Sequence, residues 1–508
     1  MVTSTPVPKN DNAGTSAFDH VPYTLPIPVS LSPPGPRATG SRLFRSGAAV
    51  ARYAIPEAFH LITRRARRPH PENARYNPVA RFLRLAAGDL GATYVKFGQF
   101  VGSAPDLFGD AIAAEFRSCL DAGPPIPFKD VRRIIEEDLG RPLLEIYATF
   151  DEQPLAAASI AAVHRARLHS GEQVAVKVLR PGMEQIVAAD LGLMTAPVRI
   201  AAEQGVERAM DLLGYLVGLR AQVGEELDLR NEAHAMRAFK TVLAELHLDL
   251  LVVPRVYDDL SSRRVLTMEY LDGVPLDAIE DMERMGLDPR PFVRQLMQAW
   301  ILTADRFRAF HADIHAGNLL MLPGTGGQDG VKLGMLDWGI VCRLDPATHK
   351  MVHGVLGASI GDEQAWEDIC DHFMSVQGQS LIDGFGLTEE QGRKLLRNMI
   401  EPIITRPVGE VSMSALFGSS DDAVWLATGE RPVKRSLVER LKHNRRVART
   451  NRMKIRDGVP EDPTQRSAFL AAKQLVYLER YWKLYLPEEP LLGDGEFVRS
   501  VLGKRGFE

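Results

Sequence analysis

Short apolar runs and longer helix-forming stretches alternate along most of this 508-residue chain. Three runs have the length and the β-branched or apolar content of strands: residues 172–180, Leu319–Leu322 and Val331–Leu336. Helix-forming composition is found from about residue 71 to 140 and again from Val223 to Phe239. The pattern predicts an α+β protein.

The N-terminal end and a basic segment near the C-terminus differ from the middle of the chain. Residues 1–41 are rich in Pro, Ser, Thr and Gly without a continuous apolar run, which predicts a disordered tail and resembles neither a secretory signal nor a transit peptide. Residues 431–457 hold about eleven Lys or Arg residues against two acids. A solvated helix face is the simpler interpretation of this segment. The alternative is an anionic partner, for which a membrane surface is favoured over nucleic acid because aromatic residues do not interleave.

The segment Phe469–Leu486 predicts a strong, aromatic-rich helix. We expect this helix to pack against the rest of the protein, and contact with a membrane interface is the alternative. The helix should not span a bilayer, because four charged residues interrupt it: Lys473, Glu479, Arg480 and Lys483.

Composition excludes several classes of protein. A formal net charge of −4 argues against general attraction to nucleic acid, so no nucleic-acid partner is expected. The apolar share of 45% and the charged share of 25% are those of an ordinary globular protein, and the length allows two to four domains. Cys119, Cys342 and Cys370 show no paired spacing, so a reducing compartment is expected and neither a zinc site nor a disulfide framework is predicted.

The candidate chemistry lies between residues 311 and 339. Residues 311–318 read H-A-D-I-H-A-G-N, and the strand predicted after them leads to Asp337-Trp338-Gly339. Protein kinases space their catalytic loop in this way: the first aspartate, here Asp313, orients or deprotonates the accepting hydroxyl, while the residues at Asn318 and Asp337 hold magnesium. Magnesium is a hard cation that prefers such oxygen ligands. The ordered set predicts phosphoryl transfer rather than a metal-free turn with surface carboxylates.

A site of this kind also needs a strand lysine for the phosphates and a helix glutamate that holds the lysine. Residues 172–180, E-Q-V-A-V-K-V-L-R, place Lys177 in a signature close to the V-A-I-K strand of kinases. The glutamate is expected between Val223 and Phe239, where spacing alone does not choose among four acids: Glu225, Glu226, Asp228 and Glu232.

The expected nucleotide loop departs from that of ordinary kinases, because no G-x-G-x-x-G precedes Lys177. Residues 154–165 read P-L-A-A-A-S-I-A-A-V-H-R, with alanines where glycines would be. Alanine still lets backbone N–H groups approach a phosphate, but it lacks the freedom of glycine at positive φ. The glycine-rich tract at residues 324–330 is predicted to be a hairpin turn and not a phosphate cradle.

Over roughly residues 75–350 the chain resembles the UbiB/AarF (ADCK-like) atypical kinases. Four motifs carry the resemblance: K-x-G-Q, the alanine-rich loop, E-x-D followed by a further glutamate, and the H-x-D…G-N and D-x-G pair described above. Together these motifs are highly specific. The residues of the first three are Lys96, Gly98 and Gln99; Ala156, Ala157, Ala158, Ser159, Ile160 and Ala161; and Glu226, Asp228 and Glu232.

The resemblance implies a two-lobed, protein-kinase-like α+β fold with helical extensions at both ends. The expected divisions after the tail are an N-terminal helical extension with K-x-G-Q at residues 42–140, a small lobe at 141–270, a large lobe with the catalytic and metal loops at 271–375, and a helical C-terminal extension at 376–508.

The resemblance also implies roles for residues. It assigns Glu232 as the partner of Lys177, and it places Glu226 and Asp228 beside the nucleotide, facing helices that in relatives cover the place where a peptide would bind. The implied hinge, whose backbone would bond the adenine edge, consists of Glu269, Tyr270 and Leu271. ATP and Mg²⁺ are the implied cofactors, with a small-molecule or lipid acceptor. The implied location is the cytoplasm, with peripheral association at an anionic membrane.

The chain departs from the family pattern at four positions without losing a charged group. Ile314 and Ala316 stand where proline is frequent, Ala162 where glutamine is frequent, and Trp338 where kinases have phenylalanine. An ATP-dependent kinase or ATPase, supporting isoprenoid-quinone or other lipid metabolism, therefore remains one function. The alternative is a nucleotide-dependent regulator or scaffold at membranes with little phosphotransfer. Both use the same residues, so the sequence does not separate them.

Overall fold

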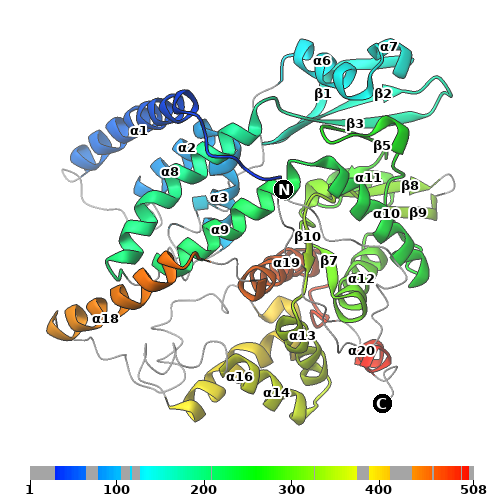
Figure 1. Cartoon of the computed structure of the whole chain (residues 1–508). Coiled ribbons are helices and arrows are strands. Elements are labelled where there is room, and N and C mark those ends of the chain that lie inside the picture. Colours follow the sequence, from blue (N-terminus) through cyan, green and yellow to red (C-terminus); the bar gives the residue numbers. More distant parts are fainter. Residues whose placement is uncertain are drawn as a thin grey trace, which may run out of the picture.

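The computed structural model shows two lobes with layers of helices beside them (Figure 1). The described residues are 29–64, 78–103, 112, 115–116, 126–206, 209–324, 327–374, 388–411, 437–459, 463–492 and 495–502. The predicted disordered tail lies outside these residues as far as position 28. Its expected end at residue 41 is placed too late, because Leu31 is buried and helix α1 begins at Pro36.

The small lobe contains a four-stranded antiparallel sheet in the order β1-β2-β3-β5. Lys177 lies on the inner strand β3, opposite Val163 on β2 and Leu266 on β5. Successive strand residues face opposite sides of a sheet, and so Lys177 shares a face with its neighbours Ala175 and Leu179. The bounds are Thr149–Ala157 for β1, Ala161–Arg167 for β2, Gln173–Leu179 for β3 and Val265–Glu269 for β5.

Helices α6 (Phe128–Leu139) and α7 (Leu143–Ile146) cover the other face of this sheet. The buried side chains of Ile134 and Ile135 on α6 form one core with the alternate valines of β3. The small lobe therefore begins before residue 141, inside the range expected for the N-terminal extension.

The helical segment predicted from Val223 to Phe239 is divided between two helices. Two residues separate helix α9 (Ala209–Glu226) from helix α10 (Leu229–Glu245). Asp228 is the N-cap of α10, because its carboxylate accepts a hydrogen bond from the backbone N–H of Arg230. The break allows acids from two separate helices to approach the same cleft.

Helices α1 (Pro36–Arg64), α2 (Pro78–Leu90) and α3 (Ala92–Ser103) lie beside the long helix α8 (Met183–Glu203) (Figure 1). Arg42 on α1 and Asp190 on α8 form a buried ion pair with Nε–Oδ1 and Nη2–Oδ2 distances of 2.5 and 2.7 Å. The same guanidinium donates to the carbonyl of Leu90, so one side chain ties three helices together.

The large lobe carries the segment between residues 311 and 339. Strand β4 pairs with β9 in parallel, while β9, β8 and β6 are antiparallel neighbours, and β7 pairs with β10. The glycine-rich tract connects β8 to β9, with Gly324 paired to Gly327, as the predicted hairpin requires. The bounds are Leu251–Val252 for β4, Val274–Pro275 for β6, Ala309–His311 for β7, Leu319–Gly324 for β8, Gly327–Met335 for β9, Val341–Arg343 for β10, Ile279–Met285 for α11, Arg290–Phe307 for α12, Pro346–Ser359 for α13 and Glu363–Phe373 for α14.

The C-terminal helices α16 (Glu389–Thr405), α19 (Pro463–Tyr485) and α20 (Gly495–Leu502) pack on the large lobe. The predicted aromatic helix is α19, which lies in the centre of the molecule beside α12, α13 and β10 (Figure 1). Its side chains at Leu478, Tyr481 and Trp482 are fully buried. Packing, not membrane contact, is therefore the role of this face of the helix.

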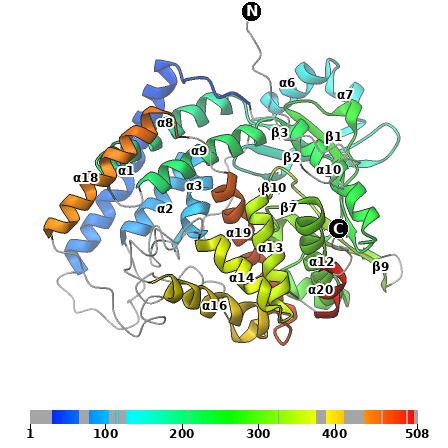
Figure 2. The same cartoon turned by 60° about the horizontal axis from the view of Figure 1, so that its bottom comes forward.

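Part of the basic segment forms helix α18 (Leu437–Arg456), which lies along α8 (Figure 2). Asn451 and Arg452 donate to the backbone carbonyls of Ala202 and Glu203, at the C-terminal end of α8. Donors at this position satisfy carbonyls that have no partner within the helix. One side of α18 is thus packed on protein, and residues 431–436 lie outside the described part of the chain.

Among the described helices, α8 is long and apolar enough to cross a membrane. Only its length and composition meet the test, and 33% of its apolar window is buried inside the molecule. A single helix of this kind is weak evidence, because core helices meet the same criteria.

Candidate active site

Three charged side chains meet where the small lobe faces the large lobe. Lys177 Nζ donates to the two carboxylate oxygens of Glu232 at 3.0 and 2.9 Å, and to Oδ1 of Asp337 at 2.9 Å. Lys177 comes from β3, Glu232 from the first turn of α10, and Asp337 from the loop after β9. Of the four acids that the spacing left open, Glu232 is the one that contacts the lysine.

Burial and charge act against each other in this cluster. Burial alone would lower the pKa of Lys177, but the carboxylates of Asp337 and Glu232 outweigh it and raise that pKa. Burial raises the pKa of Glu232 to about 7, although Lys177 opposes the change. Burial would also raise the pKa of Asp337, yet the neighbouring Lys177 holds it below its usual range. Asp337 is therefore firmly ionised, and Glu232 is the carboxylate that takes up a proton first.

His311 fixes the backbone of the predicted catalytic loop. Its Nε2 donates to the carbonyl of Leu336 at 3.1 Å, and its Nδ1 accepts from the backbone N–H of Asp313 at 3.0 Å. Burial lowers the pKa of His311, which keeps the ring neutral and suited to donate on one side and accept on the other. The ring thus connects the loop to the end of β9.

Asn318 and Asp313 are joined within the same loop. The amide nitrogen of Asn318 donates to the backbone carbonyl of Asp313 at 2.9 Å, which turns the amide so that its Oδ1 is the atom suited to a metal ion. The carboxylate of Asp313 accepts from Lys473 Nζ at 2.8 Å. Burial would raise the pKa of Asp313, but Lys473 and His315 outweigh it and lower that pKa.

The Asp337-Trp338-Gly339 turn has an uncommon backbone. Asp337 has a φ of 49°, in the left-handed region that strains residues other than glycine and is often found at functional sites. Gly339 donates its N–H to Oδ1 of Asp337 at 3.2 Å. A Cβ at Gly339 would lie 3.1 Å from the same oxygen, so the close turn favours glycine.

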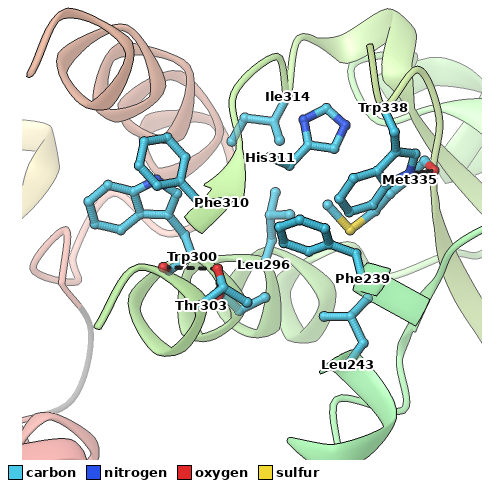
Figure 3. Close-up of a pocket in the computed structure, with 11 residues that line it drawn as sticks. Phe239, Leu243, Leu296, Trp300, Thr303, Phe310, His311, Ile314, Met335 and Trp338 are labelled. Atoms are coloured by element: carbon cyan, nitrogen blue, oxygen red, sulfur yellow. Dashed lines mark hydrogen bonds between the residues drawn. The ribbon is translucent and has the colours of Figure 1, made fainter. Parts of the chain in front are cut away.

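Trp338 joins helix α10 to the catalytic loop (Figure 3). Its ring lies 4.7 Å from the Phe239 ring of α10 and 4.4 Å, edge-on, from the His311 ring, measured between centroids. The buried indole N–H donates to the carbonyl of Met335 at 2.9 Å, so the larger ring leaves no donor without a partner. The apolar cavity in Figure 3 has a volume of about 20 Å³, enough for about one water molecule.

The alanine-rich loop is held by an arginine. Arg180 donates from Nε and Nη2 to the carbonyl of Ala158 at 3.1 and 2.7 Å, and its backbone N–H donates to Ile160 O at 2.9 Å. Arg180 follows Lys177 by three residues, so the strand that carries the phosphate lysine also positions the loop. Of the other loop residues, Ala156 and Ala157 end β1, while Ser159 and Ala161 are buried.

The K-x-G-Q segment on α3 reaches the same cleft. Lys96 Nζ lies 2.8 Å from Oε2 of Glu226, and both side chains are buried. Asp228, which is the N-cap of α10, pairs instead with Arg230. The acidic partner in the structure is therefore Glu226. Gly98 is buried on α3, and the side chain of Gln99 lies outside what the structure describes.

The residues predicted to form the hinge lie at the end of β5, away from the charged groups of the cleft. The carboxylate of Glu269 accepts from the backbone N–H of Arg255 at 3.1 Å, and the Tyr270 ring lies under the guanidinium of Arg165 at 4.6 Å. Neither they nor Leu271 line the cleft. The residues that line it are Lys96, Ala158, Ile160, Lys177, Glu225, Glu226, Asp228, Leu229, Glu232, Asp313, Asp337, Gly339 and Ile340.

Comparison with known proteins agrees with this geometry. The ABC1 atypical kinase-like domain matches residues 118–367. An uncharacterized aarF domain-containing protein kinase of Arabidopsis thaliana, named as chloroplastic, is 34% identical over 416 residues, which are 81% of this chain and 73% of that protein. The chain belongs to the ABC1 atypical kinase-like family.

Another relative is a probable protein kinase UbiB of Pseudomonas paraeruginosa, which is 35% identical over 66% of this chain and 61% of that protein. A solved structure of Rv3197 with erythromycin, from Mycobacterium tuberculosis, covers 79% of this chain and 94% of that chain at 22% identity, with a TM-score of 0.41. The predicted resemblance to UbiB and AarF proteins and the predicted kinase-like α+β fold are confirmed.

Two residues near the cleft of this ABC1 member, Arg180 and Lys473, were not predicted from the sequence. Arg180 gave no signal beyond its place after the strand. Lys473 was treated only as a charge that interrupts an apolar helix. Its spacing of seven residues from Arg466, two helical turns on one face, was the available sign that charged groups on this helix face the protein.

Proposed function

We propose that this ABC1 family member binds Mg²⁺-ATP between its lobes and either hydrolyses it or transfers its terminal phosphoryl group to a small or lipid-like acceptor. The observation that carries the proposal is the cluster in which Lys177, held by Glu232 and Asp337, lines the same cleft as Asp313. Asn318 is hydrogen-bonded to the backbone of Asp313 beside it.

The donor set fits magnesium held together with a nucleotide. Among the described residues no group of three or more His, Cys, Asp or Glu could hold a metal ion. Magnesium at nucleotide sites takes only one or two protein carboxylates and completes its coordination with phosphate and water. Asp337, ionised and 38% exposed, and Oδ1 of Asn318 would hold the ion. The bound Mg²⁺-ATP supplies the phosphoryl group and the charge that activates it.

The other side chains have separate tasks in the proposed reaction. Lys177 binds phosphate oxygens, and Glu232 keeps its ammonium group aimed into the cleft. Asp313 is held ionised by its surroundings, so its carboxylate can orient the acceptor hydroxyl and take its proton. The backbone of the alanine-rich loop, held by Arg180, faces the phosphates.

The enclosure of Asp313 supports a small acceptor. Lys96 on α3 and Lys473 on α19 both lie within the charged cluster around it, with side-chain exposures of 7% and 12%. An extended peptide would have to displace one of these helices. A role in isoprenoid-quinone or other lipid metabolism, at an anionic membrane, is proposed from the resemblance to proteins named UbiB.

Incubation of the purified chain with Mg²⁺-ATP and a membrane lipid extract tests the proposal, with phosphorylated product and free phosphate as readouts. Asp313→Asn should leave nucleotide affinity nearly unchanged while turnover falls about 10²-fold or more. Asp337→Asn should remove most of the magnesium-dependent ATP binding in a calorimetric titration, because a neutral amide compensates the metal charge poorly.

Unchanged magnesium-dependent affinity in Asp337→Asn would overturn the metal assignment. Wild-type turnover in Asp313→Asn would move the acceptor-positioning role elsewhere. A wild-type chain that binds Mg²⁺-ATP but forms neither product would leave the nucleotide-dependent regulator as the function.

A further inference from the structure

Helix α19 presents one continuous face to the proposed site, although it lies beyond the ABC1 match that ends at residue 367. Arg466, Lys473, Tyr477 and Tyr481 follow each other at spacings of seven, four and four residues, which places them on the same side of a helix. Arg466 pairs with Glu225 at the cleft, with N–O distances of 3.0 and 2.6 Å. The face therefore contacts the end of α9 and the catalytic loop at once.

Lys473 is the residue of this face that meets the proposed reaction centre. Its Nζ lies 2.8 Å from Oδ1 of Asp313, and the two side chains are 12% and 18% exposed. The ammonium group also lies 5.6 Å from the centroid of the Tyr477 ring. Burial would lower the pKa of Lys473, but the charge of Asp313 outweighs it and raises that pKa, so the contact is an ion pair.

Lys483 on the same helix forms a more exposed ion pair, which serves as a comparison. Its side chain is 39% exposed and pairs with Glu479, four residues earlier on α19. The ammonium group of Lys483 keeps contact with water, although Glu479 is buried. The Lys473 contact instead joins residues 160 positions apart and is shielded from water.

Two further contacts hold the backbone next to Asp313. Gln474 Oε1 accepts from the N–H of Ile314 at 3.3 Å, and the Tyr481 hydroxyl donates to the carbonyl of Ile314 at 2.8 Å. A proline at position 314, frequent in the resembled family, would have no N–H to donate. The departure at Ile314 thus supplies a donor that α19 uses.

We propose that Lys473 is a positioning residue for Asp313, so that the C-terminal helix α19 forms part of the phosphoryl-transfer site. The inference rests on the proposed function and deepens it. Lys473 fixes the orientation of the Asp313 carboxylate toward the acceptor, and it acts through Asp313 without a required contact to the nucleotide. Loss of Lys473 should therefore lower turnover and leave nucleotide binding in place.

The test compares Lys473→Met and Lys473→Gln with Lys483→Met as the matched control on the same helix. Phosphate release from Mg²⁺-ATP gives turnover, calorimetry gives the dissociation constant for Mg²⁺-ATP, and thermal unfolding checks folding. Both Lys473 variants should lose about 10-fold or more in turnover, while their dissociation constants stay within about 2-fold of wild type. Lys483→Met should match wild type in turnover and in the dissociation constant, and thermal unfolding reports any loss of stability from its pair with Glu479.

A double-mutant cycle separates positioning from simple structural support. Residues that act as a unit are non-additive, so Lys473→Met should change turnover less than about 2-fold in the Asp313→Asn background. An equal fold loss in both backgrounds would show a structural role and overturn the inference. Should Lys473→Met fail to fold, Lys473→Gln, which keeps a hydrogen-bond donor, takes its place in the cycle.

The remaining outcomes are also distinct. A folded Lys473 variant with wild-type turnover would overturn this inference and leave the proposed function standing. A wild-type chain without turnover would overturn the proposed enzymatic function, and this inference with it.

Discussion

At the scale of single residues, the balance between burial and neighbouring charge decides the protonation of the groups around Lys177. Glu232 is almost fully buried, whereas Asp337 keeps part of its side chain exposed. The ammonium group of Lys177 contacts both carboxylates, yet burial leaves only Glu232 with a pKa of about 7. Neutral pH therefore lies close to the titration of the carboxylate that pairs with Lys177.

This pKa gives a stability prediction with a definite sign. Glu232 binds a proton more readily in the folded chain, with a pKa of about 7 against an ordinary 4.5. Its contribution to stability is present below about pH 4.5 and is lost as pH rises through about 7. Between pH 5 and pH 8, the free energy of unfolding of wild type should fall by about 2 to 3 kcal/mol relative to Glu232→Gln, measured in urea. Parallel curves for the two proteins would refute the shift.

At the scale of elements, prediction succeeded where composition and chemistry coincide. The V-A-V-K strand and the hairpin around the glycine-rich tract were predicted from β-branched content and turn residues, and both are present. The break at Asp228 was missed, because Glu, Leu and Arg around it favour helix, while the capping carboxylate of Asp228 marks the start of α10.

The residues of the candidate site likewise fall into those that the sequence predicted and those that it did not. Lys177, Asp313, Asn318 and Asp337 belong to spaced motifs of protein kinases, and this pattern predicted their proximity although Lys177 and Asp337 are 160 residues apart. Lys473 could not be placed from the sequence, because it belongs to none of these motifs and only tertiary packing brings α19 to the loop. A motif identifies residues that function together with their neighbours in the sequence. Lys473 lies in no such motif.

Helix α3 provides a prediction for an element that enters the cleft from outside the kinase-like core. Lys96→Ala removes the ammonium group that faces buried Glu226, whose pKa burial already raises. The variant should remain folded but lose about 3 kcal/mol of unfolding free energy. Its ratio of ATP to ADP affinity should change, because α3 no longer holds α9 beside the nucleotide. Urea unfolding and calorimetry provide the two measurements.

The combined variant Lys96→Met with Glu226→Gln is the matched control, since it removes both charges. It should recover most of the stability. If Lys96→Ala kept wild-type stability and nucleotide selectivity, the contact of α3 with the cleft would have no effect on either property.

At the scale of the whole molecule, packing crosses the divisions expected from the sequence. Helix α6 shares the core of the small lobe, while α8 packs with the N-terminal helices. Helix α19, from the C-terminal extension, belongs to the same apolar core as α12 and the catalytic loop. The ABC1 match at residues 118–367 therefore does not mark an independent folding unit.

A chain that ends after residue 436 should fail to fold cooperatively. It would lack Leu478, Tyr481 and Trp482, which are fully buried, and each such loss is of the size of a large core truncation, about 2 to 5 kcal/mol. Near-ultraviolet circular dichroism and heat unfolding give the readout. Val476→Ala in the full chain changes an exposed residue of the same helix and should leave unfolding unchanged. A shortened chain with the full-length midpoint would contradict this prediction.

The distance in sequence between Asp313 and Lys473 has a consequence for synthesis. A ribosome adds about 5 to 20 residues per second, so the 160 residues between them take about 8 to 32 s to make. During that interval Asp313 lacks its partner, and the large lobe lacks the side chains of α19 that are buried in its core. A nascent chain would thus complete the cleft, and with it the proposed activity, only after α19 has been made.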